Sequence, residues 1–158
     1  MGRLIKRFAL FVMILAFPLC SYAAGSHMKV FTTTGDFDDV KDNIVFAING
    51  LGMIINNTSH IGEMLDRTGQ DLGSAKKIYL KAEALEFCSA TVSRNMMEAD
   101  PDNIVFCPYI ISIYVLPNDS SKVYVAYRKP EITGSARSRK ALKAVDTLLT
   151  DIIKEALK

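Results

Sequence analysis

The chain alternates between stretches whose apolar residues recur every second position and stretches whose apolar residues recur every third or fourth position. Residues 28–34 are rich in β-forming residues and end at Gly35, which predicts a strand. Asp36 then offers a helix N-cap, and the apolar positions that follow have the helical period. These positions are Phe37, Val40, Ile44, Ala47, Ile48 and Leu51. The pattern predicts a strand, then a helix, then a second strand over residues 53–57.

Shorter elements are predicted in the middle of the chain. Ser59 can cap a helix over residues 60–68, and the glycines that follow predict a loop over residues 69–74. Alternating apolar residues then predict a strand, with a change of parity at Leu85 and Phe87 that indicates a bulge or a break. Ser89 is the expected N-cap of another helix, which ends in a turn.

The last third of the chain contains the most apolar stretch and the clearest helix. Residues 104–116 are apolar on both alternating sets of positions, which predicts a strand covered on one side by the core and on the other by a helix or a second subunit. Pro108 cannot donate a ladder hydrogen bond, so it marks a bulge or an edge position in this strand. A hairpin leads to a strand over residues 122–128, and a loop over residues 130–137 precedes an amphipathic helix. This order predicts an α+β fold, with a mainly antiparallel sheet and helices packed on it.

The first two dozen residues have the pattern of a secretory signal. A basic segment over residues 2–7 precedes the apolar residues 8–19, which are too few for a comfortable bilayer span of about 20 residues. Small residues favour cleavage near Ala23, so residues 1–23 are interpreted as a signal peptide. The protein is then expected to be periplasmic or secreted by a bacterium, and an uncleaved N-terminal anchor is the alternative.

Removal of the signal changes the charge and leaves one domain. Three positive charges and no negative charge leave with it, so the formal net charge changes from +2 to −1. The mature chain then has no overall attraction to nucleic acid or anionic lipid, and neither a nucleic-acid partner nor a membrane span is expected. We expect an N-terminal strand region over residues 24–33, a core over residues 34–130 and a C-terminal helix over residues 131–158, packed as one domain. Residues 25–28, Gly-Ser-His-Met, are either native or a remnant of tag removal.

Three segments together resemble a known family: GDFDDVKDNIVFAINGLGMII, EFCSATVSRNMMEADPDNIVFCPYIISIYVLPND and KVYVAYRKP. The matching positions are Phe37, Gly52, Phe87, Cys88, Pro108 and Tyr114, within residues 34–130. On these positions the chain resembles the family called domain of unknown function 302. The resemblance implies an antiparallel sheet with two long helices, similar to the TATA-binding-protein-like arrangement, without implying a nucleic-acid role. Some relatives are joined to cytochrome-like or thiol-redox modules, so the resemblance favours periplasmic redox or sulfur metabolism.

Cys88 and Cys107 remain after signal cleavage, whereas Cys20 leaves with the signal and lacks the small preceding residue of a lipid anchor. Two such cysteines usually pair in an oxidising compartment, and closing a loop of about 20 residues contributes on the order of 3 kcal/mol. Alternatively, Cys88 lies at a predicted helix start, where the helix dipole would lower the pKa of its thiol. Cys88 would then be the attacking member of a redox pair and Cys107 the resolving member. The third interpretation is two small core residues.

Two surface groups are candidate binding sites. Aromatic area gathers on the final hairpin, where an uncovered face would bind a second copy or a small apolar ligand. The residues concerned are Tyr109, Tyr114, Tyr124 and Tyr127. Basic residues gather around the last helix start, where a bound anion would offset their unfavourable interaction with the helix dipole, and a solvated loop is the alternative. These residues are Arg128, Arg137, Arg139 and Lys140.

His27 and His60 are the histidines of the chain and its candidate metal ligands. Cleavage after Ala24 would place His27 third in the mature chain, in a Gly-Ser-His sequence suited to square-planar copper or nickel. His60 has Glu63 and Asp66 near it at helical spacing, although a solvated helix start has the same composition. No covalent-haem motif is present, so no cofactor is predicted, with haem or metal as the alternative.

No hydrolase or zinc-protease motif is present, and we expect a binding or accessory module rather than an enzyme. The doubly apolar strand over residues 104–116 favours a homodimer. The alternative is a thiol-dependent redox or sulfur-carrier protein that uses Cys88 and Cys107 with a periplasmic redox partner. A haem or metal binder is the third possibility.

Overall fold

The described chain begins with an edge strand and ends with its longest helix. The computed structural model describes residues 27–74 and 76–158. The strands are β1 (Met28–Thr34), β2 (Ile55–Ser59), β3 (Lys81–Phe87), β4 (Tyr109–Leu116) and β5 (Asp119–Arg128). The helices are α1 (Phe37–Gly50), α2 (Ile61–Asp71), α3 (Ala90–Ala99), the 3₁₀ helix η1 (Pro101–Phe106) and α4 (Ala136–Ala156). The predicted signal peptide, its cleavage site and residues 25 and 26 lie outside the described residues.

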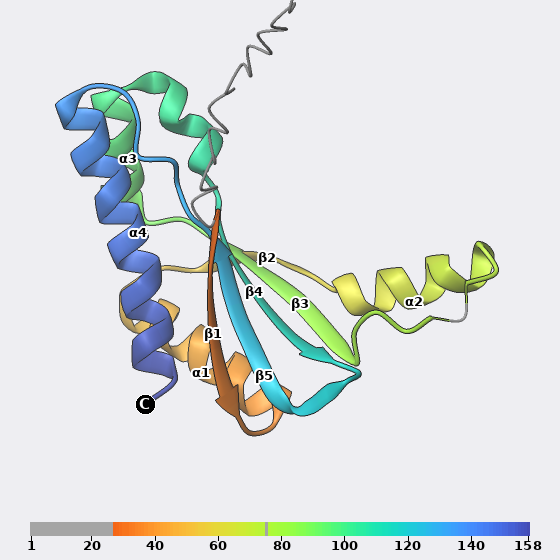
Figure 1. Ribbon diagram of the computed structural model, residues 1–158. Helices are drawn as coiled ribbons and strands as arrows, with labels where there is room; N and C mark the ends of the chain where they lie inside the picture. Colours follow the sequence, from red (N-terminus) through yellow and green to blue (C-terminus); the bar gives the residue numbers. More distant parts are fainter. Residues whose placement is uncertain (1–26, 75) are drawn as a thin grey trace, which may run out of the picture.

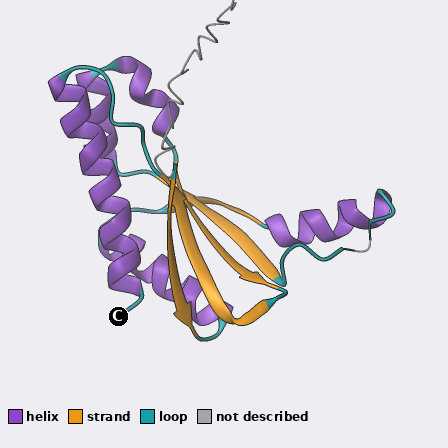
Figure 2. Cartoon of the chain, in the orientation of Figure 1, coloured by secondary structure: helices purple, strands orange, loops and turns teal. Residues whose placement is uncertain are grey.

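The five strands form one antiparallel sheet in the order β1-β5-β4-β3-β2. Helices α1 and α4 pack together on one face of this sheet, and α3 packs against α4 at the end of the same layer (Figures 1 and 2). This arrangement confirms the predicted α+β fold.

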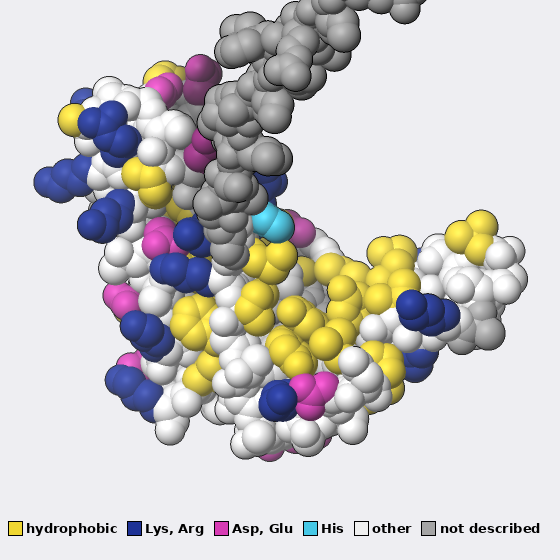
Figure 3. All heavy atoms as spheres, viewed as in Figure 1, with side chains coloured by type: hydrophobic (Ala, Val, Ile, Leu, Met, Phe, Trp, Pro, Cys, Tyr) yellow, Lys and Arg dark blue, Asp and Glu magenta, His cyan; other side chains and the backbone are white. Residues whose placement is uncertain are grey.

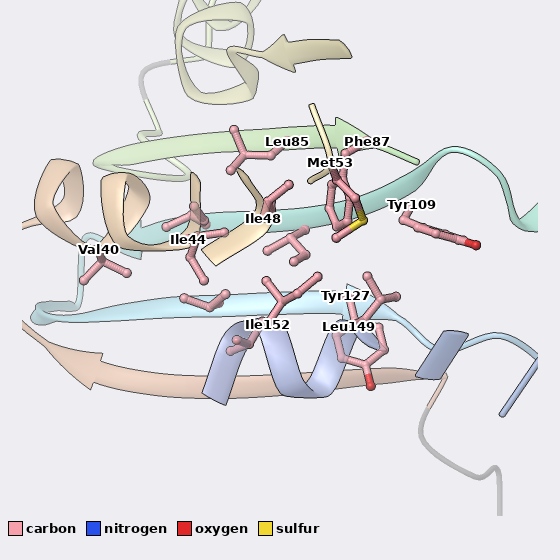
Figure 4. Close-up of a cluster of buried hydrophobic side chains, with 14 of the residues drawn as sticks. Val40, Ile44, Ile48, Met53, Leu85, Phe87, Tyr109, Tyr127, Leu149 and Ile152 are labelled. Carbon is pink, nitrogen blue, oxygen red and sulfur yellow. The ribbon is translucent and has the colours of Figure 1, made fainter. Parts of the chain in front are cut away.

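The core lies between the sheet and this helical layer. Asp36 accepts a hydrogen bond from the backbone N–H of Asp38 at 2.7 Å, so α1 begins where its N-cap predicts. The apolar stripe of α1 then faces the sheet and meets buried strand residues and the stripe of α4 (Figure 4). Fully buried members of this core are Ile44, Ile48, Phe87, Ile111, Ile113, Val125, Leu142 and Ile152.

The predicted strand over residues 104–116 is wrong in its first part. Residues 101–106 form η1, because Asp100 caps this 3₁₀ helix by accepting from the backbone N–H of Asp102 at 3.1 Å. Pro108 therefore precedes β4 and is neither a bulge nor an edge position within it, and the Cys107–Pro108 peptide bond is cis.

The predicted bulge or break at Leu85 and Phe87 is also wrong. Strand β3 pairs with β4 without a register shift from Lys81 to Phe87. The apolar parity changes because Ala82 and Ala84 are buried on one face of the strand, whereas Leu85 and Phe87 are buried on the other. A register shift occurs instead in β2, between Ile55 and Asn57.

The second helix begins and ends later than predicted. Its N-cap is His60, which makes no side-chain cap bond, while the predicted cap Ser59 ends β2. The Ser59 hydroxyl lies 3.5 Å from a carboxylate oxygen of Glu86 on the neighbouring strand. The helix continues to Asp71, into the predicted loop over residues 69–74.

The opposite face of the sheet carries no helical layer within the described part of the chain. Helix α2 projects outward beside this face, and hydrophobic side chains extend from the sheet onto α2 (Figure 3). Met28, Val30 and Ile110 on this face are 40, 46 and 43 % exposed. We call this surface the open face.

Candidate thiol site

Cys88 and Cys107 lie at the two ends of the α3–η1 segment, which connects β3 to β4. Phe87 and Tyr109 form the last pair of the β3–β4 ladder, and their rings meet edge to face with centroids 6.0 Å apart. The chain leaves the sheet at Cys88, forms α3 and η1, and returns at Cys107. Antiparallel pairing of Phe87 with Tyr109 therefore brings the two cysteines together just beyond the ladder.

The sulfur atoms of Cys88 and Cys107 lie 2.9 Å apart, and both residues are free cysteines. Both side chains are partly exposed. A disulfide bond requires sulfur atoms about 2.05 Å apart, so less than about 1 Å of approach separates the dithiol from the disulfide. The structure thus brings together the two thiols that the sequence singled out.

A polar chain runs from these sulfurs into the protein interior. The Ser93 hydroxyl oxygen, on α3, lies 3.7 Å from the Cys107 sulfur and 3.0 Å from the Tyr109 hydroxyl oxygen. Ser93 and Tyr109 are 8 % and 2 % exposed. Figure 4 shows the Tyr109 hydroxyl directed away from the aliphatic cluster. The four groups form a continuous series: Tyr109, Ser93, Cys107, Cys88.

The environment of Cys88 is the reverse of the one predicted from its position before a helix. Burial, followed by the hydrogen bond with Cys107, raises the pKa of the Cys88 thiol to about 11. Ser89 rather than Cys88 is the N-cap of α3, accepting from the backbone N–H of Val92 at 3.4 Å. The expectation of a lowered pKa at Cys88 is therefore wrong, because desolvation of the thiol and the neighbouring Cys107 raise the pKa. Burial likewise raises the pKa of the Tyr109 hydroxyl.

The α3–η1 segment is hydrogen-bonded to the N-terminal part of α4 through Asn103 of η1. The Asn103 side-chain amide donates to the backbone carbonyl of Met96 at 3.0 Å and to the Ser138 hydroxyl at 2.9 Å. Asn103 and Ser138 are buried, so both bonds form away from solvent. These bonds hold η1, and with it the chain that returns at Cys107, against the helical layer.

A cleft of about 200 Å³ lies beside η1 and the start of β4. Val105, Pro108 and Ile110 contribute apolar surface to it, and Arg128 contributes a cation. Ile104 and Val105 of η1 are 59 and 77 % exposed. The cleft borders Pro108, the residue that follows Cys107, and its apolar surface is large enough for a side chain of another molecule.

The family model for the domain of unknown function DUF302 matches residues 29–158. The chain belongs to the DUF302 family. A similar solved structure is a crystal structure of an uncharacterized conserved DUF302 protein from Bacillus stearothermophilus, with a TM-score of 0.69 and 10 % sequence identity. The match covers 84 % of this chain and 99 % of that one, and at this identity it supports the fold alone. No curated protein sequence matches the chain.

The four candidate tyrosines of this DUF302 domain lie on opposite faces of the sheet. The rings of Tyr114 and Tyr124 stack on the open face with centroids 5.1 Å apart. Tyr109 and Tyr127 instead face the helical layer, where the Tyr127 hydroxyl donates to a carboxylate oxygen of Asp146 at 2.6 Å. The alternation of side chains along strands separates the set, because Tyr124 and Tyr127 differ in parity.

The candidate anion-binding residues have separate partners. Arg137 lies 3.7 Å from a carboxylate oxygen of Glu98, and Arg139 donates to the backbone carbonyl of Gly134. Arg128 lies at the end of β5 beside the cleft, and Lys140 is exposed on α4. The structure therefore does not bring the four cations to a single ligand position.

The histidines do not form a metal cluster in the described part of the chain. His60 lies 3.6 Å from a carboxylate oxygen of Glu83, and His27 lies at the start of β1. Residues 27–74 and 76–158 contain no group of three or more His, Cys, Asp or Glu side chains placed to hold a metal ion. The same residues contain no helix with the length and apolar character of a membrane span.

Sequence reasoning missed Ser93 as a partner of the thiols. Ser93 lies one turn after the N-cap Ser89, and its backbone N–H donates to the Ser89 carbonyl at 2.8 Å. Its position on the same side of α3 as the helix start was the available signal, since residues four apart lie on one helix face. Tyr109 was recognised as a candidate ligand residue, but not as a partner of Ser93.

Proposed function

We propose that this DUF302 protein exchanges electrons with thiols and disulfides through Cys88 and Cys107. The observation that carries this proposal is the 2.9 Å separation of two partly exposed, free sulfur atoms. Thiol–disulfide exchange requires two sulfurs that can bond to each other and a partner sulfur that can reach one of them. An oxidising compartment, which the N-terminal signal predicts, supports the same function.

The reaction is balanced by the partner. When the dithiol is oxidised, the two cysteines lose two protons and two electrons and form one S–S bond, while a partner disulfide accepts them and becomes two thiols. The reverse reaction reduces the Cys88–Cys107 disulfide and oxidises two partner thiols. The apolar cleft beside Pro108 and the exposed Ile104 and Val105 offer contact area for a protein or peptide that carries those sulfurs.

Equilibration with glutathione tests the proposal. We expect purified protein in buffers of reduced and oxidised glutathione to lose both thiols together, in a single two-electron transition measured by alkylation and intact mass. The potential should lie above about −300 mV, because structural disulfides in secreted proteins lie below it. The matched variants Cys88→Ser and Cys107→Ser should instead form a mixed disulfide with glutathione.

Two results would contradict the proposal. Retention of both thiols in excess oxidised glutathione would mean that the sulfurs are core residues. A transition far below −300 mV would mean that the pair forms a structural disulfide.

A second candidate function is homodimerisation through the open face. The exposed Met28, Val30 and Ile110 on the sheet adjoin the apolar side of α2 (Figure 3). Met64 on α2 and Leu72, its C-cap, are 42 and 83 % exposed. A short isolated helix is marginally stable in water, so α2 gains from a partner on its apolar side. A two-fold axis would place α2 of each copy on the open face of the other, so that both open faces and both α2 helices are covered.

Light scattering over a concentration series tests the dimer. We expect wild type to be dimeric at micromolar concentration and Val30→Asp, on the open face, to be monomeric. Phe46→Asp is the matched control, because Phe46 is 80 % exposed on α1, in the layer on the other side of the sheet. A wild type that stays monomeric at every concentration would overturn the dimer.

A further inference from the structure

The direction of one hydrogen bond follows from the burial of Tyr109. The Tyr109 hydroxyl is buried, and its hydrogen-bond partner within the described residues is the Ser93 hydroxyl at 3.0 Å. A buried hydroxyl hydrogen without an acceptor costs about 1–3 kcal/mol. Tyr109 must therefore donate its hydrogen to Ser93, because the opposite direction would leave the tyrosine hydrogen without an acceptor. Burial raises the pKa of Tyr109 and outweighs the hydrogen bond with Ser93, which lowers it, so the phenol keeps its proton at neutral pH.

The direction of the Tyr109–Ser93 hydrogen bond determines the direction of the Ser93–Cys107 hydrogen bond. When the Ser93 oxygen accepts from Tyr109, the Ser93 hydrogen is available to its other neighbour, the Cys107 sulfur at 3.7 Å. The same sulfur also has the Cys88 thiol at 2.9 Å. The pKa of Cys88 is raised, so at neutral pH this thiol keeps its proton and can donate it toward Cys107. Two donors thus converge on the Cys107 sulfur.

We propose that Cys107 is the sulfur that becomes the thiolate and attacks, and that Cys88 resolves the resulting mixed disulfide. Ser93 and Tyr109 are positioning residues, because Tyr109 donates to Ser93 and Ser93 donates to the Cys107 sulfur. Hydrogen bonds to a charged acceptor stabilise the charged form, and here they come from Ser93 and Cys88. For Cys88, burial and the neighbouring Cys107 raise the pKa of the thiol and outweigh the backbone hydrogen bond of Tyr109, which lowers it, and no charged side chain contributes. The choice between the two sulfurs therefore depends on hydrogen-bond direction. This inference rests on the proposed exchange function and reverses the roles expected from the sequence.

The assignment defines each step of the exchange. The Cys107 thiolate attacks one sulfur of a partner disulfide, forms a mixed disulfide and releases the other partner sulfur as a thiolate. Cys88 then gives its proton to the partner thiolate released in the first step and attacks the Cys107 sulfur. The Cys88–Cys107 bond forms, and the remaining partner sulfur leaves as a second thiolate. The protein loses two electrons in total and the partner disulfide gains them.

Alkylation of single-cysteine variants tests the assignment without any exchange partner. We expect the pH midpoint of iodoacetamide alkylation to be lower for Cys107 in Cys88→Ser, which keeps a hydroxyl donor, than for Cys88 in Cys107→Ser. Adding Ser93→Ala to Cys88→Ser should reduce the alkylation rate at pH 7 about tenfold, which corresponds to a rise of about one pKa unit. Tyr109→Phe should reduce the rate less, because the Ser93 hydroxyl remains beside Cys107. Tyr127→Phe is the matched control and should leave the rate unchanged, because that hydroxyl bonds to α4 and not to the thiols.

A measurement on the unmodified protein covers variants that fail to fold. Substoichiometric iodoacetamide on reduced wild type, followed by peptide mapping, should label Cys107 before Cys88. Faster labelling of Cys88, or an unchanged midpoint when Ser93 is replaced by alanine, would overturn the assignment. A wild type that labels at Cys107 first but does not exchange with glutathione would contradict the proposed function alone.

Discussion

Tyr109 and Tyr127, on neighbouring strands, both face the helical layer, but their hydroxyls contact different kinds of groups. Tyr109 of β4 contacts Ser93, and the chain of contacts ends at two thiols. Tyr127 of β5 donates to the Asp146 carboxylate at 2.6 Å and lies 2.8 Å from the Thr150 hydroxyl. Lys29 of β1 closes this second cluster with a 2.8 Å ion pair to Asp146. We call the two sets the thiol chain and the Lys29 cluster.

The two sets differ in whether a member can change its covalent state. In the Lys29 cluster the carboxylate is satisfied by an ammonium and a phenol, and its atoms join the edge strand β1 to α4. None of these groups undergoes redox chemistry under ordinary conditions. The thiol chain contains no carboxylate and no ammonium group, and it ends at two sulfurs 2.9 Å apart. We therefore expect the Lys29 cluster to stabilise the fold and, under the proposed function, the thiol chain to support thiol–disulfide exchange.

Asp146→Ala should have the largest effect on stability. The substitution removes the carboxylate that the Lys29 ammonium and the Tyr127 hydroxyl share and leaves the Thr150 hydroxyl as a common partner, so we expect the free energy of unfolding to fall by about 3 kcal/mol. Urea denaturation of the reduced protein measures this change. Thiol alkylation of the folded variant should not change, since Asp146 does not contact the thiol chain.

The matched control for this variant is Asp151→Ala. Asp151 is an exposed carboxylate on the same helix, and we expect a change within about 0.5 kcal/mol. Equal losses in the two variants would show that the Lys29 cluster contributes nothing specific, and the contrast between the two sets would fail.

Tyr127→Phe should have the next largest effect. It removes one donor to a charged acceptor but leaves the Lys29–Asp146 ion pair, so we expect a loss of about 1.5 kcal/mol in urea denaturation. Tyr109→Phe removes a bond between neutral groups and should cost about 1 kcal/mol or less. A larger loss for Tyr109→Phe than for Tyr127→Phe would mean that the thiol chain has the greater structural role.

Much of the fold follows from the sequence pattern because long amphipathic helices and their caps are local signals. Helix α1 was predicted from Asp36 and its apolar stripe, and both are observed. The pattern failed at residues 104–106, where apolar side chains in a row suggested a strand. Asp100 and Pro101 start a 3₁₀ helix there, and periodicity cannot distinguish a short helix from a buried strand.

The candidate site could be predicted only in part. The strand, helix, strand order permits Cys88 and Cys107 to lie close together, and the structure places their sulfurs 2.9 Å apart. The pKa of Cys88 could not be predicted, because it depends on how deeply the thiol is buried at the end of the ladder. The role of Ser93 depends on the rotation of α3 about its axis, which places its hydroxyl between Cys107 and Tyr109. The four-residue spacing from Ser89 places Ser93 on the side of the helix start, but it does not predict that Tyr109 lies beside it.

The pH dependence of stability should separate the two sets with the smallest effects. Burial raises the pKa of Asp146, but hydrogen bonds from Lys29 and Tyr127 outweigh it, so the pKa is lowered below 3.8. A lowered carboxyl pKa stabilises the folded state above about pH 4, and this contribution is lost as the pH falls.

For Cys88 the folded pKa of about 11 exceeds the ordinary 9.0, so the folded state binds the proton more tightly. That contribution is complete below about pH 9 and is lost as the pH rises toward 11. Urea denaturation of reduced wild type, Asp146→Ala and Cys88→Ala across this range should show the wild-type advantage over Asp146→Ala shrinking in acid. Relative to Cys88→Ala, wild type should lose stability only in alkali, and loss of this alkaline change would remove the case for a protonated Cys88 beside Cys107.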